Sequence, residues 1–273
     1  MQSRLVKDSL VQDMLSTSVH QQLAQRLYDA YQNHSALSPL SDEFPQLETT
    51  DSYTIQSLLV GLIVKKSTHA AEGFKLGFTS AAMREQMKVA EANYGFLLPG
   101  SRVQSSAVFS DFIHPRIEPE IAVVTALELS GHVSLAEVSA ATNYCCASME
   151  IVDSRFLDYR FKAVDNVADN SSAAAYCLGK KFSLSKIESP EQMRCRFFKS
   201  DELIAEGLGS DAMGGPLQAV QWLTHKLANN GQSLPAGSVV MTGGLSRAEL
   251  AEPGDQFRVE FSDIPGELKL SFI

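Results

Sequence analysis

The sequence has only four cysteines and no long apolar run, and each shortage excludes a class of protein. Cys145, Cys146, Cys177 and Cys195 show neither C-x-x-C spacing nor the spacing of a metal site, so we expect buried, reduced thiols. The longest apolar run, Leu58–Val64, is far shorter than the roughly 20 residues that cross a bilayer. The N-terminal stretch MQSRLVKDSL has no apolar signal-peptide core, which favours a cytoplasmic location.

Positive charge is also scarce. The 273 residues include 23 Lys and Arg against 32 Asp and Glu, a formal net charge of -9. Binding to nucleic acid needs a basic face, so this balance argues against it. The six histidines form neither H-x-x-H nor H-E-x-x-H, which argues against a zinc site. The composition, 44% hydrophobic and 20% charged, is that of a soluble globular protein, and we expect neither a nucleic-acid nor a membrane partner.

Helical patterns come first along the chain and strand patterns follow. Apolar residues recur at helical spacing over about Ser9–Gln32, and again after Asp51, which we expect to cap the second helix. Short strand patterns dominate thereafter, which indicates an α+β fold. We expect a helical N-terminal segment, residues 1–70, packed on a body of residues 71–273, the two together forming one structural domain.

The expected elements of the body follow from alternation and from capping residues. Strands are expected at residues 73–78, 105–109, 120–129, 146–155, 237–243, 256–261 and 267–272. Helices are expected at residues 81–89, from Ser134 to about Tyr144, and from Pro216 to a stop at Gly231.

An acidic motif stands at the entry to one expected strand. In PRIEPEIAVV (Pro115–Val124), Glu118 and Glu120 are two residues apart, so both side chains point to one side of an extended chain. Pro119 favours that extended conformation. Two carboxylates so close repel each other unless something positive lies between them.

A third acid, Glu150, stands among apolar residues, where a lone charge is costly. Three carboxylates converging from two strands would suit Mg²⁺ or Mn²⁺, because these cations prefer oxygen ligands. The pattern alone leaves alternatives open. Glu118 and Glu120 could be solvated edge residues while Glu150 pairs with an arginine, and three other acids are equally available as ligands: Asp111, Asp153 and Asp158.

Five motifs occur in an order and spacing that resemble one family. They are KLGFTS (75–80), PRIEPEIA (115–122), MEIVDSR (149–155), VADNSS (167–172) and MTGGL (241–245). In them the chain resembles the 2-keto-4-pentenoate hydratases and 4-oxalocrotonate decarboxylases of the fumarylacetoacetate hydrolase superfamily. The resemblance covers nearly the whole chain after the first helix. It implies a mixed β-sheet roll or barrel with a helical N-terminal segment.

The resemblance also implies roles for particular residues. Mg²⁺ or Mn²⁺ would be held by Glu118, Glu120 and Glu150. Lys75 would be the active-site lysine, which pairs with the substrate or moves a proton. The remaining implied residues are Ser172 as a catalytic hydroxyl, Thr242 and Gly243 beside the substrate, and Arg155 as a partner that orients a ligating carboxylate near the substrate.

The chain departs from the family pattern at one position. Family members commonly read PDYG where this chain reads ANYG, so Asn93 replaces an aspartate near the active site. An amide cannot act as a general base, although it can hydrogen-bond substrate or water. The departure bears on proton transfer and leaves the three glutamates unaffected.

The activity that the resemblance implies is that of a lyase in aromatic catabolism. It would hydrate a 2-hydroxy-2,4-dienoate to a 4-hydroxy-2-oxo acid. One alternative is the related 4-oxalocrotonate-type decarboxylase, which needs a further cation, for which Arg84 and Lys88 are candidates. The other alternative is a non-catalytic metal-binding or assembly paralogue. The resemblance further implies a homo-oligomer, with a partner enzyme of the same pathway as a candidate contact.

Overall fold

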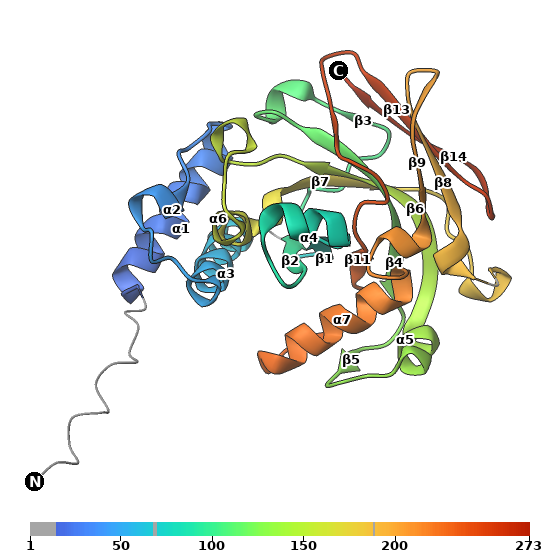
Figure 1. Ribbon diagram of the computed structural model, residues 1–273, viewed down its shortest axis with the longest axis horizontal. Coiled ribbons are helices and arrows are strands. Elements are labelled where there is room, and N and C mark those ends of the chain that lie inside the picture. Colours follow the sequence, from blue (N-terminus) through green and yellow to red (C-terminus); the bar gives the residue numbers. More distant parts are fainter. Residues whose placement is uncertain (1–14, 68–69, 188) are drawn as a thin grey trace, which may run out of the picture.

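The computed structural model describes residues 15–67, 70–187 and 189–273. Its main parts are a layer of helices at the N-terminus and two large β-sheets (Figure 1). The N-terminal helices are α1 (Thr17–Asn33), α2 (Leu40–Glu43) and α3 (Thr49–Lys65). Figure 1 shows them in blue on one flank of the molecule, next to α6 (Ala163–Ala168). None of the helices in the described ranges is long and apolar enough to cross a membrane.

Apolar side chains hold the N-terminal helices together and against the rest of the chain. Leu23 and Leu27 of α1 and Ile55 of α3 are fully buried in one cluster. The same cluster includes Phe156 and Ala168, which lie far along the chain. Because burying one such aliphatic side chain contributes about 1.5–3 kcal/mol, this cluster anchors the helices on the body.

The ends of these helices differ from the expected ones. The helix α3 begins at Thr49, with Glu48 rather than Asp51 as its N-cap, so the expected cap was wrong by three residues. Asp51 instead accepts the Glu48 backbone N–H at 3.1 Å, as the second half of a capping box. The expected helix start at Ser9 lies outside the described residues.

The larger sheet has seven strands in the order β2-β1-β11-β4-β6-β7, with β12 also paired to β4. It is mixed, because β1 and β11 run parallel and the other neighbours run antiparallel. The long strand β6 bends strongly in Figure 1, so the sheet curls. The strands are β1 (Gly73–Gly77), β2 (Asn93–Leu97), β4 (Arg116–Thr125), β6 (Thr142–Val152), β7 (Ala173–Leu178), β11 (Val239–Met241) and β12 (Glu249–Leu250).

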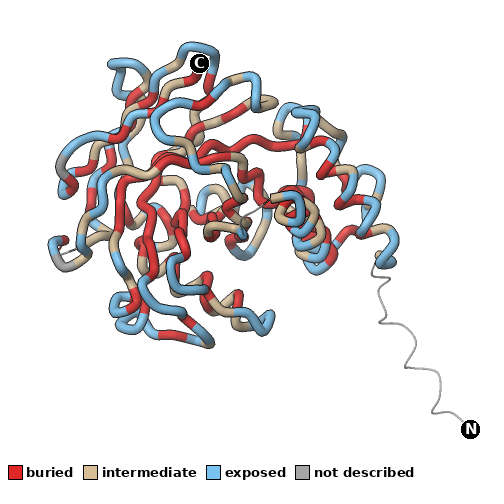
Figure 2. Tube along the Cα trace, turned by 180° about the vertical axis from the view of Figure 1, so that it is seen from behind, coloured by how far each residue is buried: buried red, intermediate tan, exposed pale blue. Residues whose placement is uncertain are grey.

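The central strand β4 is buried on both faces over its second half. Ile121 and Val123 point into the main core, whereas Ala122 and Val124 point into a second cluster on the opposite face. This arrangement explains the unbroken apolar run IAVV, which is typical of strands covered on both sides. The tube in Figure 2 is red along the strands of this region, as expected for a buried centre.

A five-stranded sheet, in the order β3-β14-β13-β8-β9, packs on the other side of the main core. Its strands are β3 (Ser106–Ala107), β8 (Arg194–Lys199), β9 (Glu202–Leu208), β13 (Gln256–Phe261) and β14 (Ile264–Phe272). A small pair, β5 (Leu129–Ser130) and β10 (Ser233–Leu234), lies near α5 (Leu135–Ala141) and α7 (Pro216–Asn229). The remaining helix, α4 (Ala81–Met87), has no buried residue.

The α+β class and the helical N-terminal segment are confirmed, whereas several boundaries were wrong. The helix expected to reach Tyr144 ends at Ala141, because Thr142 already pairs with Thr125 across β6 and β4. Sequence patterns also missed β2, β7, β8, β9 and α6. All four cysteines are free and buried, as expected.

Candidate metal centre and active site

Three glutamates converge at the middle of the large sheet. Glu118 and Glu120 lie on the same face of β4, and Glu118 is the direct cross-strand partner of Glu150 on β6. One carboxylate oxygen from each residue lies within 4.8 Å of the others. The structure therefore brings together the three acids that the motifs single out. Neither Asp111 nor Asp153 belongs to this cluster: Asp153 instead accepts the backbone N–H groups of Ile113 and His114, at 2.9 and 2.8 Å.

The cluster is charged, buried and short of hydrogen-bond donors. Glu120 and Glu150 are both 0% exposed. Glu120 Oε1 and Glu150 Oε2 accept no hydrogen bond within the described part of the chain. Burial raises the pKa of Glu120 well above its usual value, and Glu150 and Glu118 raise it further. Burial also raises the pKa of Glu150 to about 7, although Lys75 lowers it. Unpartnered oxygens on crowded acids are the donor set that a hard divalent cation needs, so these residues fit Mg²⁺ or Mn²⁺.

Lys75 lies beside the three acids. It is on β1, its side chain is 3% exposed, and Nζ lies 3.2 Å from Glu150 Oε1. Nζ also donates a hydrogen bond to the backbone oxygen of Ser171 at 2.9 Å. Burial lowers the pKa of Lys75, but the three carboxylates outweigh this and leave the pKa above its usual value. The lysine is therefore held as an ammonium at the edge of the acidic cluster.

The backbone opposite Lys75 is an unusual turn. Asn170, Ser171 and Ser172 form a short 3₁₀ turn, η3, and have φ values of 51, 55 and 57°. Left-handed backbone in three consecutive non-glycine residues costs energy, and such strain is concentrated at functional sites. Asn170 stabilises the turn: its side chain donates to the Phe96 carbonyl at 2.9 Å and accepts from the Phe96 N–H at 2.8 Å.

A chain of buried polar side chains continues from this turn to Asn93. Ser171 Oγ donates to Asn93 Oδ1 at 2.9 Å, and Asn93 Nδ2 donates to Asn166 Oδ1 at 2.8 Å. Asn166 Nδ2 in turn donates to Ser172 Oγ at 3.0 Å. Ser171 therefore links Lys75 to Asn93. The Asn93 side-chain amide accepts one hydrogen bond and donates another. The sequence patterns did not single out Ser171 or Asn166, although both lie in or beside the VADNSS motif.

Thr242 and Gly243 contact β4. Thr242 Oγ1 donates to the Ile121 carbonyl at 2.7 Å, and the Gly243 N–H donates to Glu120 Oε2 at 2.9 Å. A Cβ on Gly243 would lie 2.3 Å from the Thr79 hydroxyl, and its φ is +109°, so only glycine fits. These residues orient Glu120.

Arg155 has a different partner from the one expected. It is 4% exposed, and its side chain donates to Asp169 Oδ1, to the Asp169 carbonyl and to the Ala173 carbonyl. Among the described residues it makes no ion pair with any of the three glutamates. The carboxylate that Arg155 orients is therefore that of Asp169, which directly precedes the strained turn.

Removal of the Arg155 guanidinium should destabilise the fold in a pH-dependent way. Arg155→Met should lower the free energy of unfolding by about 3–5 kcal/mol, because it leaves a buried carboxylate without its partner. Burial already raises the pKa of Asp169 to about 6, although Arg155 lowers it. Without Arg155 that pKa rises further above its unfolded value. The folded state then binds the extra proton, so the loss should shrink as the pH falls from 8 to 5.

Urea titrations at both pH values measure this loss. The exposed Arg160, which is on the same segment, is the matched control, and Arg160→Met should change stability by less than about 0.5 kcal/mol. A loss for Arg155→Met that grows towards low pH would contradict the assignment.

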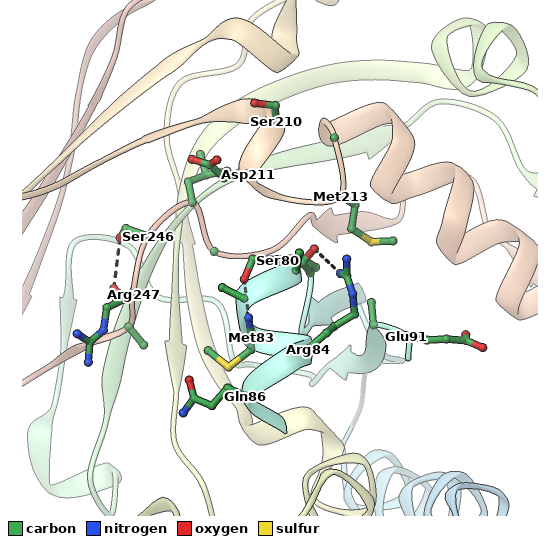
Figure 3. Close-up of a pocket in the computed structure, with 18 of the residues that line it drawn as sticks. Ser80, Met83, Arg84, Gln86, Glu91, Ser210, Asp211, Met213, Ser246 and Arg247 are labelled. Carbon is green, nitrogen blue, oxygen red and sulfur yellow. Dashed lines mark hydrogen bonds between the residues drawn. The ribbon is translucent and has the colours of Figure 1, made fainter. Parts of the chain in front are cut away.

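Two adjoining cavities lead to the cluster. The inner one has a volume of about 240 Å³, and Lys75, Glu118, Ser171 and Ser172 are among its lining residues. The outer one has a volume of about 1140 Å³. Figure 3 shows the outer cavity, with Met83, Arg84 and Gln86 of α4 on one side of it. Across the cavity lie Ser210, Asp211, Met213, Ser246 and Arg247. Arg116 lines both cavities and was not singled out by the sequence.

Comparison with known proteins agrees with this geometry. Residues 74–270 match the family model described as fumarylacetoacetate (FAA) hydrolase C-terminal. A 4-oxalocrotonate decarboxylase of Pseudomonas putida is 32% identical over 92% of this chain and 96% of its own. A 2-hydroxyhexa-2,4-dienoate hydratase of Comamonas testosteroni is 34% identical over 85% of this chain and 90% of its own.

A solved structure extends the similarity to three dimensions. The 4-oxalocrotonate decarboxylase from Pseudomonas putida G7, complexed with magnesium and adipate, superposes with a TM-score of 0.91. It is 31% identical, and the match covers 95% of this chain and 99% of that one. The chain belongs to the fumarylacetoacetate hydrolase family, in the group that contains the 2-keto-4-pentenoate hydratases and the 4-oxalocrotonate decarboxylases.

Proposed function

We propose that the chain is a divalent-metal-dependent lyase that hydrates a 2-hydroxy-2,4-dienoate to a 4-hydroxy-2-oxo acid. The observation that carries the proposal is the cluster of Glu118, Glu120 and Glu150 beside Lys75, facing a cavity. A divalent cation held by the three glutamates would supply a Lewis acid for the oxygens of a 2-oxo acid. The relatives that carry hydratase names support this reaction type.

The chain's own residues would hold and move protons. The Lys75 ammonium, kept in place by the Ser171 carbonyl and Glu150, is the group with a proton to give at the cavity wall. The Ser172 hydroxyl lines the same cavity and can hydrogen-bond substrate or water. Asn93 would act as a positioning residue, because it contacts Ser171 and lies outside the inner-cavity lining. Thr242 and Gly243 would keep Glu120 oriented.

A second candidate is decarboxylation of a 4-oxalocrotonate-type 2-oxo acid. Two observations favour it: relatives with that name, one of them the structural match described above, and the presence of Arg84 and Arg116 in the lining of the outer cavity. Both reactions need the same stabilisation of negative charge on the 2-oxo group, so the three glutamates serve either. Lys88 lines neither cavity, whereas Arg84 lines the outer one.

The non-catalytic alternative rests on Asn93 alone. It is disfavoured by the intact set of three glutamates and Lys75, because a chain without chemistry has no need to bury like charges together.

Assays with two substrates decide among these functions. Purified protein with Mg²⁺ or Mn²⁺ should turn over 2-hydroxypenta-2,4-dienoate, monitored by the loss of dienoate absorbance. Release of CO₂ from 4-oxalocrotonate would instead assign the decarboxylase. Turnover of neither substrate with either metal would overturn both enzyme functions and leave the non-catalytic paralogue.

The proposal extends to organisation and setting. Residues 71–273 would form the catalytic part, with residues 1–70 packed on it as one domain through the shared apolar cluster. The protein would work in the cytoplasm as a homo-oligomer, in contact with an enzyme of the same pathway. Light scattering at micromolar concentration tests the assembly, and a monomer mass would overturn that part of the proposal.

A further inference from the structure

Arg116 lies on the same face of β4 as two of the clustered acids. Residues 116, 118 and 120 alternate along the strand, so Arg116, Glu118 and Glu120 point to one side. Residues two apart on a strand are about 6.6 Å apart, so Arg116 is the next residue on this face after Glu118, on the side away from Glu120. Because Arg116 lines both cavities, it stands where the inner cavity opens into the outer one.

The guanidinium of Arg116 lies over an aromatic ring. Its Cζ lies 4.5 Å from the centre of the Tyr159 ring. Tyr159 is itself fixed, because its hydroxyl donates to the Val152 carbonyl at 2.9 Å and its ring packs on His114. Stacking on an aromatic face orients a guanidinium while leaving its in-plane N–H groups available.

Those N–H groups are not all satisfied within the described part of the chain. Among the residues that the structure describes, none accepts a hydrogen bond from the buried Arg116 Nε, and no carboxylate lies within ion-pair distance of Arg116. A buried donor without a partner is costly, so the site is shaped for an acceptor that comes from outside. A carboxylate is the acceptor whose two oxygens match the fork of an arginine.

The two other arginines that line the cavities suit this task less well. Arg84 Nη1 already donates to the carbonyls of Phe78 and Thr79, at 3.1 and 2.7 Å. Arg247 is exposed and lines only the outer cavity.

We propose that Arg116 binds a carboxylate of the substrate at the junction of the two cavities. The inference rests on the proposed function, because it assumes a 2-oxo acid held at the three glutamates. The shared chemistry is a carboxylate, which could be the one next to the 2-oxo group or one at the far end of a dicarboxylic substrate.

Calorimetry with two saturated analogues tests the proposal. With Mg²⁺ present, 2-oxopentanoate offers one carboxylate and 2-oxohexanedioate offers two. Arg116→Gln should weaken binding by about tenfold to a hundredfold, the value of a charge-assisted hydrogen bond. A loss for both ligands assigns the carboxylate next to the 2-oxo group, and a loss for 2-oxohexanedioate alone assigns the far one. Arg116→Lys should restore part of the affinity, because it keeps the charge but not the fork.

The controls separate this role from folding and from metal binding. Arg247→Gln removes the same charge from the outer cavity only and should leave both affinities within about twofold. Mg²⁺ affinity without ligand should change by about fivefold or less in Arg116→Gln, and its melting curve shows whether it folds. Unchanged affinity of folded Arg116→Gln for both analogues would overturn the role of Arg116 alone. Failure of the wild-type protein with Mg²⁺ to bind either analogue would overturn the proposed function as well.

Discussion

Replacing Glu120 by glutamine should weaken Mg²⁺ or Mn²⁺ binding by at least about a hundredfold, since loss of a direct ligand exceeds the loss of a supporting residue. Glutamine keeps the shape of the side chain and can still accept the Gly243 N–H. It removes one of the carboxylates that converge at the centre. Isothermal calorimetry with each metal measures the change.

The same substitution should stabilise the metal-free protein. Glu120 is fully buried, and Glu150 and Glu118 both make its ionisation unfavourable. Removing one of several buried like charges relieves that repulsion, so the melting temperature without metal should rise by a few degrees. With excess Mg²⁺ the order should reverse, because only the wild type gains stability from binding.

A melting temperature above that of the wild type without metal and below it with excess Mg²⁺ distinguishes a metal ligand from a structural acid. Glu206, exposed on the edge strand β9, is a matched control, and Glu206→Gln should leave the metal affinity and the melting temperature unchanged. Unaltered metal affinity in Glu120→Gln would refute the assignment of the centre.

Replacing Lys75 by methionine should reduce turnover by about 10²–10⁴-fold, the usual contribution of a positioned acid or base. The methionine side chain fills similar space but has no ionisable proton, and it cannot donate a hydrogen bond to the Ser171 carbonyl. A single-turnover assay with saturating metal isolates this loss from any change in metal affinity.

Loss of the lysine charge should also leave a signature in the metal-free protein. The carboxylates around Lys75 lose a buried cation, so stability should fall by about 3–5 kcal/mol without metal. Metal affinity should increase, because a positive charge beside the cation site is gone. Lys186→Met, at an exposed position, should change neither the stability without metal nor the metal affinity. Wild-type turnover in Lys75→Met with saturating metal would show that the proton comes from elsewhere.

The local patterns of the chain were sufficient for the elements with strong periodicity. The spacing of apolar residues located α1 and α3, and Pro216 located the start of α7. Short strands such as β2 and β7 were not predicted. The segments Asn93–Leu97 and Ala173–Leu178 show no alternation of polar and apolar residues, and pairing with neighbouring strands holds them in the sheet. The end of α5 was misplaced because pairing of Thr142 with Thr125 overrides its helical pattern.

The sequence by itself determined that Glu118 and Glu120 share one side of a strand, because the direction of alternate side chains is a local property of extended backbone. The tertiary structure alone decided which residues meet them. Pairing of β4 with β6 sets Glu150 opposite Glu118 across more than thirty residues of chain, and the Lys75 side chain reaches the cluster from β1. It also gave Arg155 its partner Asp169 and left Arg116 with an unpaired donor beside Tyr159. Strand register and loop conformation depend on packing between distant segments, and no local pattern carries that information.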